Sequence, residues 1–124
     1  MTADPTVLLI DDSASVRELL RVALESEGYH VLEAADGREG VRLHPKHRPA
    51  LVIADIVMPE KDGIETVKEI LGMDPAAVIF TLSAQDADGD YQETARMLGA
   101  RQGFRKPLKI EDLLLVLRCQ VPPE

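Results

Sequence analysis

The chain has 124 residues, of which 45% are hydrophobic and 29% charged, a length and composition typical of one folded domain and not of a disordered segment. Its formal net charge of -8 argues against direct binding to nucleic acid or to an anionic membrane, and its single cysteine, Cys119, excludes an internal disulfide. No signal peptide or membrane span is recognisable, so we expect a cytoplasmic protein.

Short apolar runs separated by amphipathic stretches recur along the chain. They predict strands at residues 7–10, 29–34, 51–54, 78–82 and 103–105. The first, third and fourth runs are apolar on both sides, as in strands that are covered on both faces. The other two mix polar and apolar residues, which suits the edges of a sheet.

Apolar residues at helical spacing fill the segments between these strands. They predict helices within residues 16–24, 38–43, 64–71, 91–98 and 110–117. Glycine or proline is expected to end these helices, for example Gly28 and Gly99. The second helix is the weakest, because Gly40 lies inside it and Pro45 is expected to truncate it. We interpret Asp36-Gly37, just before it, as a turn only.

Strand and helix alternate five times, which predicts an α/β fold with three layers, a parallel sheet and right-handed crossovers. In such sheets ligands bind beyond the carboxyl ends of the strands. The polar residues that follow or end the predicted strands are Asp11, Asp12, Asp55, Ser83 and Lys106. We therefore expect these five side chains to meet at one edge of the sheet.

Three carboxylates at one edge repel one another. At about 5 Å and an effective dielectric constant near 20, each pair costs on the order of 3 kcal/mol, so the cluster calls for a compensating cation. Carboxylate oxygens with an open side suit Mg²⁺. Such an ion, a lysine and a hydroxyl group can together hold a phosphoryl group in transfer, with a carboxylate as the nucleophile.

Four motifs follow the predicted strands in order: LLIDDS at 8–13, DIVMPEKDG at 55–63, TLSA at 81–84 and GARQGFRKP at 99–107. They resemble the receiver domains of two-component response regulators, the CheY-like family. The resemblance implies a flavodoxin-like three-layer sandwich, with five helices and five parallel strands in the order 2-1-3-4-5. It also implies a single domain over residues 1–124, with a core of about residues 6–119 between a polar N-terminal and a Pro-rich C-terminal tail.

The resemblance implies a role for each acid of the cluster. Asp55 matches the phosphoacceptor, which carries an aspartyl phosphate after transfer. Asp12 matches a direct ligand of Mg²⁺, or of Mn²⁺ in its place, and Asp11 a ligand acting through water. The backbone carbonyl of Val57 is implied as the remaining metal ligand from the protein.

The resemblance also assigns the residues that bind the phosphoryl group. Ser83 matches the hydroxyl residue that moves toward the phosphoryl group, and Lys106 matches the lysine that pairs with it. The peptide bond between Lys106 and Pro107 is implied to be cis, which X-Pro bonds allow at low cost.

A receiver of this kind takes a phosphoryl group from the phosphohistidine of a sensor histidine kinase or a phosphotransfer protein in a phosphorelay, or slowly from a small acyl phosphate. The transfer is expected to switch the face of the fourth helix and fifth strand toward a downstream protein that the sequence does not identify. We expect the chain to be a monomer or a phosphorylation-dependent homodimer. We also expect it to act as a signalling phosphoacceptor and not as a turnover enzyme.

One position departs from the family pattern. An aromatic residue usually lies three residues before the lysine, but here Gly103 holds that position and Phe104 follows it. Since successive strand residues face opposite sides, we expect Phe104 to point away from the switch surface and into the core. The residues of the switch are then Ser83, Gly103 and Phe104. The signal passes from the site to the partner-binding face either by the usual route or by a different one, in which Gly103 supplies backbone mobility.

Three alternatives compete with a phosphorylated receiver. A degenerate receiver that serves as a scaffold is favoured by Gly103 and opposed by the complete set of polar residues. A phosphatase of the haloacid dehalogenase class needs a second Asp two residues after the nucleophile, where Val57 follows Asp55. A dinucleotide-binding domain is disfavoured because no glycine lies between Asp11 and Gly28.

The remaining polar residues are expected to be structural. Residues 11–13 also fit a helix N-cap. His44 and His47 flank Pro45 in a basic segment, and we expect both to be solvated. The acidic residues at 86, 88 and 90 are interpreted as a solvated loop that leads into a helix.

Overall fold

The computed structural model describes residues 5–56, 63–83, 89–106 and 109–122. Within these residues the strands are β1 (Thr6–Ile10), β2 (His30–Ala34), β3 (Leu51–Asp55), β4 (Ile79–Ser83) and β5 (Gln102–Arg105). The helices are α1 (Ala14–Ser26), α2 (Gly37–His47), α3 (Gly63–Met73), α4 (Gly89–Leu98) and α5 (Ile110–Gln120). Strand and helix alternate along the whole described chain, as predicted.

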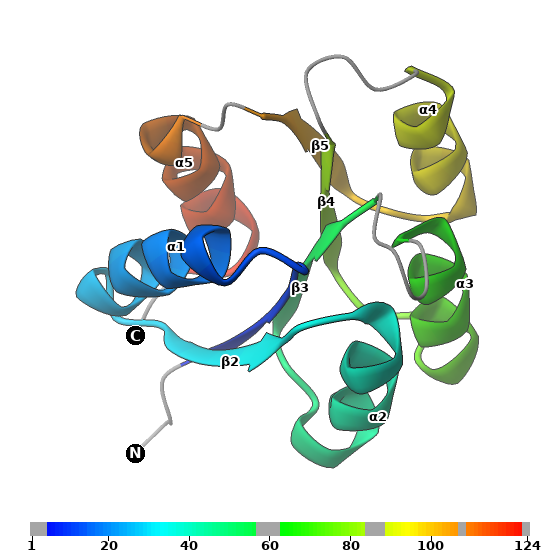
Figure 1. Ribbon diagram of the computed structural model, residues 1–124, viewed down its shortest axis with the longest axis horizontal. Helices are drawn as coiled ribbons and strands as arrows, with labels where there is room; N and C mark the ends of the chain where they lie inside the picture. Colours follow the sequence, from blue (N-terminus) through cyan, green and yellow to red (C-terminus); the bar gives the residue numbers. More distant parts are fainter. Residues whose placement is uncertain (1–4, 57–62, 84–88, 107–108, 123–124) are drawn as a thin grey trace.

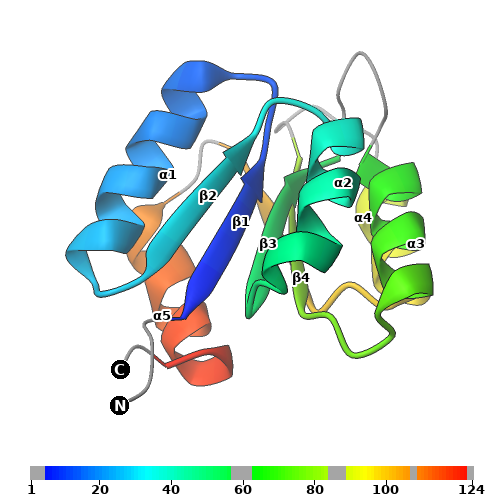
Figure 2. The ribbon, with the colours of Figure 1, turned by 90° about the horizontal axis from the view of Figure 1, so that it is seen from below.

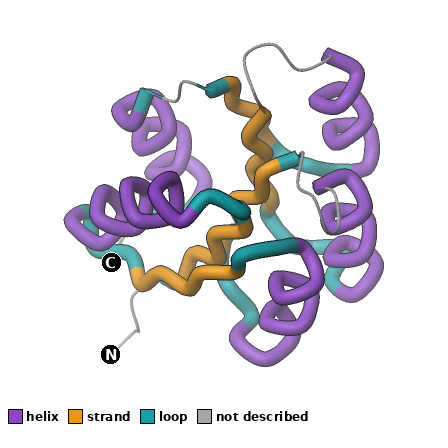
Figure 3. The backbone as a smooth tube through the Cα atoms, viewed as in Figure 1, coloured by secondary structure: helices purple, strands orange, loops and turns teal. Residues whose placement is uncertain are grey.

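The strands form one parallel sheet in the order β2-β1-β3-β4-β5. Helices α1 and α5 cover one face of this sheet, and α2, α3 and α4 cover the other (Figures 1 and 2). Figure 3 shows the strands as a single layer between the two layers of helices. The flavodoxin-like three-layer sandwich and the edge positions of β2 and β5 are therefore confirmed.

Each central strand contributes to two hydrophobic cores, because its successive side chains face opposite sides of the sheet. Val7 and Leu9 of β1 pack with residues of α1 and α5 on one face. Leu8 and Ile10 pack with residues of α3 on the other face. Each fully buried aliphatic side chain of this kind contributes about 1.5–3 kcal/mol to stability. The apolar runs of the sequence thus become strands that helices cover on both sides.

Two glycines end helices in the left-handed backbone conformation. Gly28 has a φ angle of 97° just after α1, and Gly99 has one of 124° just after α4. The amide of Gly99 donates to the carbonyls of Ala95 and Arg96 at 3.2 and 3.0 Å, which satisfies the end of α4. Both predicted helix ends are confirmed.

Helix α2 differs from the prediction at both ends. Asp36 is more than a turn residue, because its carboxylate accepts a hydrogen bond from the Glu39 amide at 2.9 Å and so caps the helix. The prediction that Pro45 truncates α2 is wrong, since the helix continues through it to His47. The left-handed residue Arg48 closes the last turn by donating from its amide to the His44 carbonyl at 2.8 Å, which offsets the hydrogen bond that Pro45 cannot make.

The expectation that His44 is solvated is also wrong: the residue is 2% exposed. Gly40, one turn earlier on the same side of α2, lies so close to β1 that a Cβ there would overlap the side chain of Ile10. This close approach carries His44 into the interior. Burial lowers the pKa of His44, while the carboxylate of Asp74 opposes that shift. His47 is exposed, as expected.

Candidate functional site

The carboxyl ends of β1 and β3 bring three carboxylates together. Asp11 and Asp12 follow β1 directly, and Asp55 is the last residue of β3. One carboxylate oxygen from each residue lies within 4.8 Å of the other two. Asp11 and Asp55 are 2% and 5% exposed, whereas Asp12 is exposed to solvent. The cluster therefore consists of two buried acids and a third acid that faces solvent.

Lys106, just after β5, lies between the two buried acids. Its Nζ atom donates to Asp11 Oδ2 at 3.2 Å and to Asp55 Oδ2 at 3.3 Å. Burial of the ammonium acts to lower its pKa, but the charges of Asp55 and Asp11 together with the hydrogen bonds to both acids outweigh burial, so the pKa of Lys106 is raised above its ordinary value. Lys106 is consequently a permanent cation of the site at neutral pH.

Hydrogen bonds fix the position of Asp11 on three sides. Its amide donates to the Ala34 carbonyl at 3.1 Å, and its Oδ1 atom accepts from the Ser13 amide at 2.9 Å. Its carbonyl accepts from Arg17 Nη1 at 2.5 Å, and Glu33 holds that guanidinium in turn at 3.1 Å. The orientation of the Asp11 carboxylate is therefore set by the fold itself.

Ile56, the residue directly after Asp55, is held by the start of α3. The Gly63 amide donates to the Ile56 carbonyl at 2.5 Å. A Cβ atom at position 63 would overlap the Asp55 carbonyl oxygen and the Ile56 Cα atom. Only glycine lets α3 begin this close to β3, so Gly63 helps to position the backbone of the acid cluster.

Ser83 is the last residue of β4 and is buried. It pairs in register with Arg105 of β5, and its carbonyl accepts a hydrogen bond from the Lys106 amide at 2.7 Å. On the other side of β4, Leu82 pairs with Asp55. The ladder thus places Ser83 beside Lys106 and one residue beyond the level of Asp55, at the same edge of the sheet.

Gly103 and Phe104 face opposite sides of β5. The Phe104 ring packs against the core between the sheet and α5, with its centroid 5.7 Å from that of Phe80. Gly103 pairs with Thr81 and lies on the side of α4. The alternation expected from the sequence holds at this position.

Several predicted features lie outside the described residues. They are the Val57 carbonyl, Pro107 with its expected cis bond, and the acidic residues Asp86 and Asp88. Conversely, sequence reasoning missed Arg17, which binds the backbone of Asp11. A basic residue one turn into the helix that follows an acidic pair is the signal that could have indicated it.

The described residues thus hold a cluster of three acids, two of which contact one lysine, at the carboxyl edge of a parallel sheet of order 2-1-3-4-5. The family model described as "Response regulator receiver domain" matches residues 7–118. The chain belongs to this family. No helix in the described part of the receiver is long and apolar enough to cross a membrane.

Relatives and solved structures extend this assignment. The receiver is 38% identical to the transcriptional regulatory protein PdtaR of Mycobacterium tuberculosis over 93% of its own length, but spans only 56% of that relative. It is 38% identical to the chemotaxis protein CheY of Thermotoga maritima, covering 83% of this chain and 86% of CheY. The Vibrio cholerae chemotaxis protein CheY4 has a similar structure, with a TM-score of 0.87, 32% identity and coverage of 95% and 99% of the two chains.

Proposed function

We propose that this receiver accepts a phosphoryl group on Asp55 and thereby switches a surface that binds a partner protein. The observation that carries the proposal is the contact of Lys106 with both buried carboxylates of a three-acid cluster. A half-buried cation among acids at the ligand-binding edge of a parallel sheet suits an incoming anion. A group with three charged oxygens can take over the contacts that Lys106 makes with the acids.

In the proposed reaction, a carboxylate oxygen of Asp55 bonds to the phosphorus atom of a phosphohistidine on a sensor kinase or phosphotransfer protein. The bond between phosphorus and the imidazole nitrogen breaks, and the imidazole leaves with a proton from solvent. An acyl phosphate on Asp55 results. Lys106 and the hydroxyl of Ser83 then bind the phosphoryl oxygens, and attack by water later releases phosphate. The chain remains a signalling phosphoacceptor throughout.

The donors of the cluster fit a divalent cation, since three carboxylates offer hard oxygen ligands within one small volume. Asp12 and Asp55 would hold Mg²⁺ or Mn²⁺ directly and Asp11 through water, with the Val57 carbonyl as a further ligand. When bound, the ion neutralises the acids and lets the charged phosphoryl group approach.

The ladder between β4 and β5 links the site to the surface near α4. Ser83 ends β4, Lys106 directly follows β5, and the two residues share a backbone hydrogen bond. Movement of Ser83 toward a phosphoryl group therefore changes the ends of both strands. We propose that this shift favours one of two arrangements of the α4–β5 face, which a downstream protein or a second receiver recognises.

The proposal is tested by incubating the receiver with acetyl phosphate and Mg²⁺ and measuring its intact mass. Wild type should gain one phosphoryl group that hydroxylamine removes, because acyl phosphates are sensitive to it. Asp55→Asn should gain none, while Asp74→Asn, at the opposite edge of the sheet, should be labelled like wild type.

Labelling of Asp55→Asn at the wild-type level would refute the assignment of the acceptor. Absence of label in wild type would instead favour the degenerate receiver that acts as a scaffold. The two failures are distinguishable, because the first moves the acceptor to another residue and the second removes the reaction altogether.

A further inference from the structure

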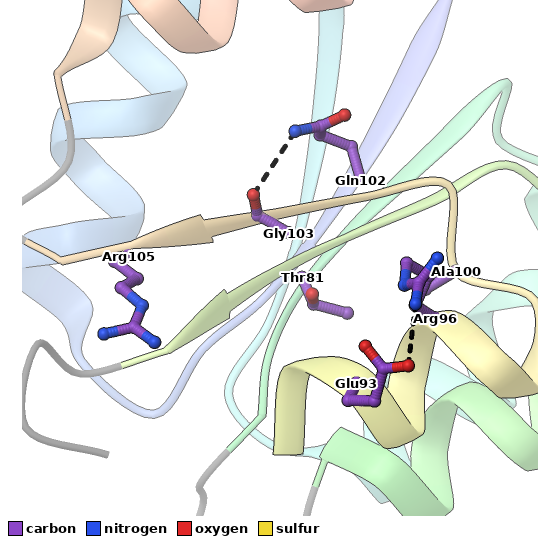
Figure 4. Close-up of a pocket in the computed structure, with 7 residues that line it drawn as sticks. All are labelled: Thr81, Glu93, Arg96, Ala100, Gln102, Gly103 and Arg105. Carbon is purple, nitrogen blue, oxygen red and sulfur yellow. Dashed lines mark hydrogen bonds and ion pairs between the residues drawn. The ribbon is translucent and has the colours of Figure 1, made fainter. Parts of the chain in front are cut away.

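A cavity of about 300 Å³ lies between α4 and β5, apart from the acid cluster. Thr81 and Gly103 line it from the sheet, and Glu93 and Arg96 line it from α4 (Figure 4). Arg105 lies at its other end, near the end of β5 (Figure 4). Its volume is at the lower limit of pockets that bind small molecules, and so suits a single side chain.

The cavity exists because β5 has no side chain at Gly103, opposite α4. Thr81 and Gly103 are paired neighbours in the ladder and share a face of the sheet. The next residue, Phe104, packs on the opposite face. Helix α4 therefore faces bare backbone at Gly103, and a flat surface remains against which a ring can lie.

The described residues that line the cavity carry a net positive charge. Arg96 pairs with Glu93 at 2.7 Å, so these two charges compensate each other. Arg105 has no hydrogen-bonding or ion-pair partner within the part of the chain that the structure describes, which leaves one uncompensated guanidinium. In a chain of net charge -8, this local excess of positive charge favours an acidic ligand.

Apolar side chains lie exposed on the same helix. Met97 is one turn after Glu93 on α4 and is 77% exposed, and Leu98 is 37% exposed. A free solute inside the cavity would leave this apolar surface in water, whereas a protein surface would cover it. The exposed residues therefore favour a macromolecular occupant.

We propose that the cavity binds an aromatic side chain of a partner protein that carries an acidic residue beside the ring. The ring lies against Gly103 and Thr81, and the guanidinium groups of the two arginines that line the cavity contact the face of the ring. The neighbouring carboxylate pairs with Arg105. This inference deepens the proposed function and rests on it, because the proposed function identifies the partner as the downstream protein. Binding itself does not require phosphorylation.

Titration of the isotope-labelled receiver with short blocked peptides, followed by amide chemical shifts, tests the inference. The probe is Ac-Glu-Tyr-Glu-Ala-NH2, with Ac-Lys-Tyr-Lys-Ala-NH2 as the charge control and Ac-Glu-Ala-Glu-Ala-NH2 as the ring control. The acidic tyrosine peptide should give saturable shifts at Gly103 and Ala100, with a dissociation constant on the order of 1 mM. Both controls should bind at least about fivefold more weakly.

Two variants locate the binding. Gly103→Tyr fills the cavity from within, which its backbone permits because its φ angle is not positive, and should weaken peptide binding at least about tenfold. Arg105→Gln should weaken it about threefold, as expected for one exposed ion pair, while Arg42→Gln on α2 should have no effect. Arg105→Gln keeps the test valid if Gly103→Tyr fails to fold.

Equal binding of the lysine peptide, or unchanged binding to both Gly103→Tyr and Arg105→Gln, would overturn the inference. Tighter binding of free 4-hydroxyphenylacetate than of the acidic peptide would overturn the commitment to a protein partner. Labelling of Asp55 by acetyl phosphate is measured on the same samples. Absence of peptide binding to the wild-type receiver, with intact labelling, then refutes this inference alone and leaves the proposed function in place.

Discussion

The two ends of the sheet each bury ionisable side chains, but they differ in what surrounds them. At the carboxyl end, Lys106 contacts both Asp11 and Asp55. At the amino end, His44 is buried in the last turn of α2, the helix that precedes β3 along the chain. The Nε2 atom of His44 has no hydrogen-bonding partner among the described residues. At the first end the two carboxylates raise the pKa of Lys106, whereas burial at the second end lowers the pKa of His44 and favours the neutral imidazole.

This difference teaches which buried groups indicate chemistry. A buried histidine whose Nε2 atom has no hydrogen-bonding partner among the described residues, beside a cavity of about 200 Å³, is accounted for by the packing of α2 against β1. Three acids and a lysine at one edge are not required by packing, and their mutual repulsion costs stability. Convergence of charges, more than burial alone, therefore marks the functional end of the sheet.

Removal of the lysine should produce the largest effect. Lys106→Met leaves Asp11 and Asp55 buried without a cation, and we expect it to lower the free energy of unfolding by about 2–4 kcal/mol at neutral pH in EDTA. Urea denaturation measures the loss. Lys68→Met removes an exposed lysine of α3 and should change stability by no more than about 0.5 kcal/mol. Equal losses in the two variants would show that Lys106 does not hold the carboxyl end together.

Addition of Mg²⁺ should have an intermediate effect. If the dissociation constant is about 1 mM, 10 mM MgCl2 raises the free energy of unfolding by about 1.4 kcal/mol, because the ion binds the acid cluster of the folded state. Thermal denaturation of the wild type measures the shift, with NaCl at equal ionic strength as control.

The variant Asp55→Asn isolates the cluster as the source of that shift. Without Mg²⁺ it should be as stable as wild type or more stable, because one of three repelling charges is gone. With Mg²⁺ it should gain much less than wild type. A wild-type gain in the variant would mean that the ion binds elsewhere on this acidic chain.

Much of the carboxyl end could be predicted from the sequence, because short-range patterns determine it. Apolar runs such as residues 7–10 define strands that are buried on both faces, and the residue after each run must lie at the same edge. The positions of Asp11, Asp55 and Lys106 follow from this rule and from the register of the ladder. The strand order came from the resemblance of four motifs.

Short-range sequence patterns did not predict the structure at the amino end of the sheet. Pro45 and Gly40 are unfavourable in an isolated helix, and local preferences therefore predicted a short α2 with an exposed His44. The outcome depended on the contact of Gly40 with Ile10, which only the packed structure reveals. Arg17 was missed for a similar reason, since its contact with the Asp11 carbonyl depends on where α1 crosses the sheet.

The smallest predicted effect concerns the pH dependence of the amino end. Burial lowers the pKa of His44 from the ordinary value of 6.5 against the opposing charge of Asp74. Below pH 6.5 the unfolded chain therefore binds a proton that the folded chain does not. Stability from this residue is complete above that pH and is lost as the pH falls toward the lowered pKa. At pH 6.0 the loss is at most about 0.8 kcal/mol.

Urea denaturation at pH 8.0 and 6.0 compares the wild type with His44→Gln and with the exposed control His47→Gln. The decrease between the two pH values should be smaller in His44→Gln, by up to about 0.8 kcal/mol, and unchanged in His47→Gln. An identical decrease in all three proteins would mean that His44 accepts its proton in the folded state, and the contrast between the two ends of the sheet would then fail at the amino end.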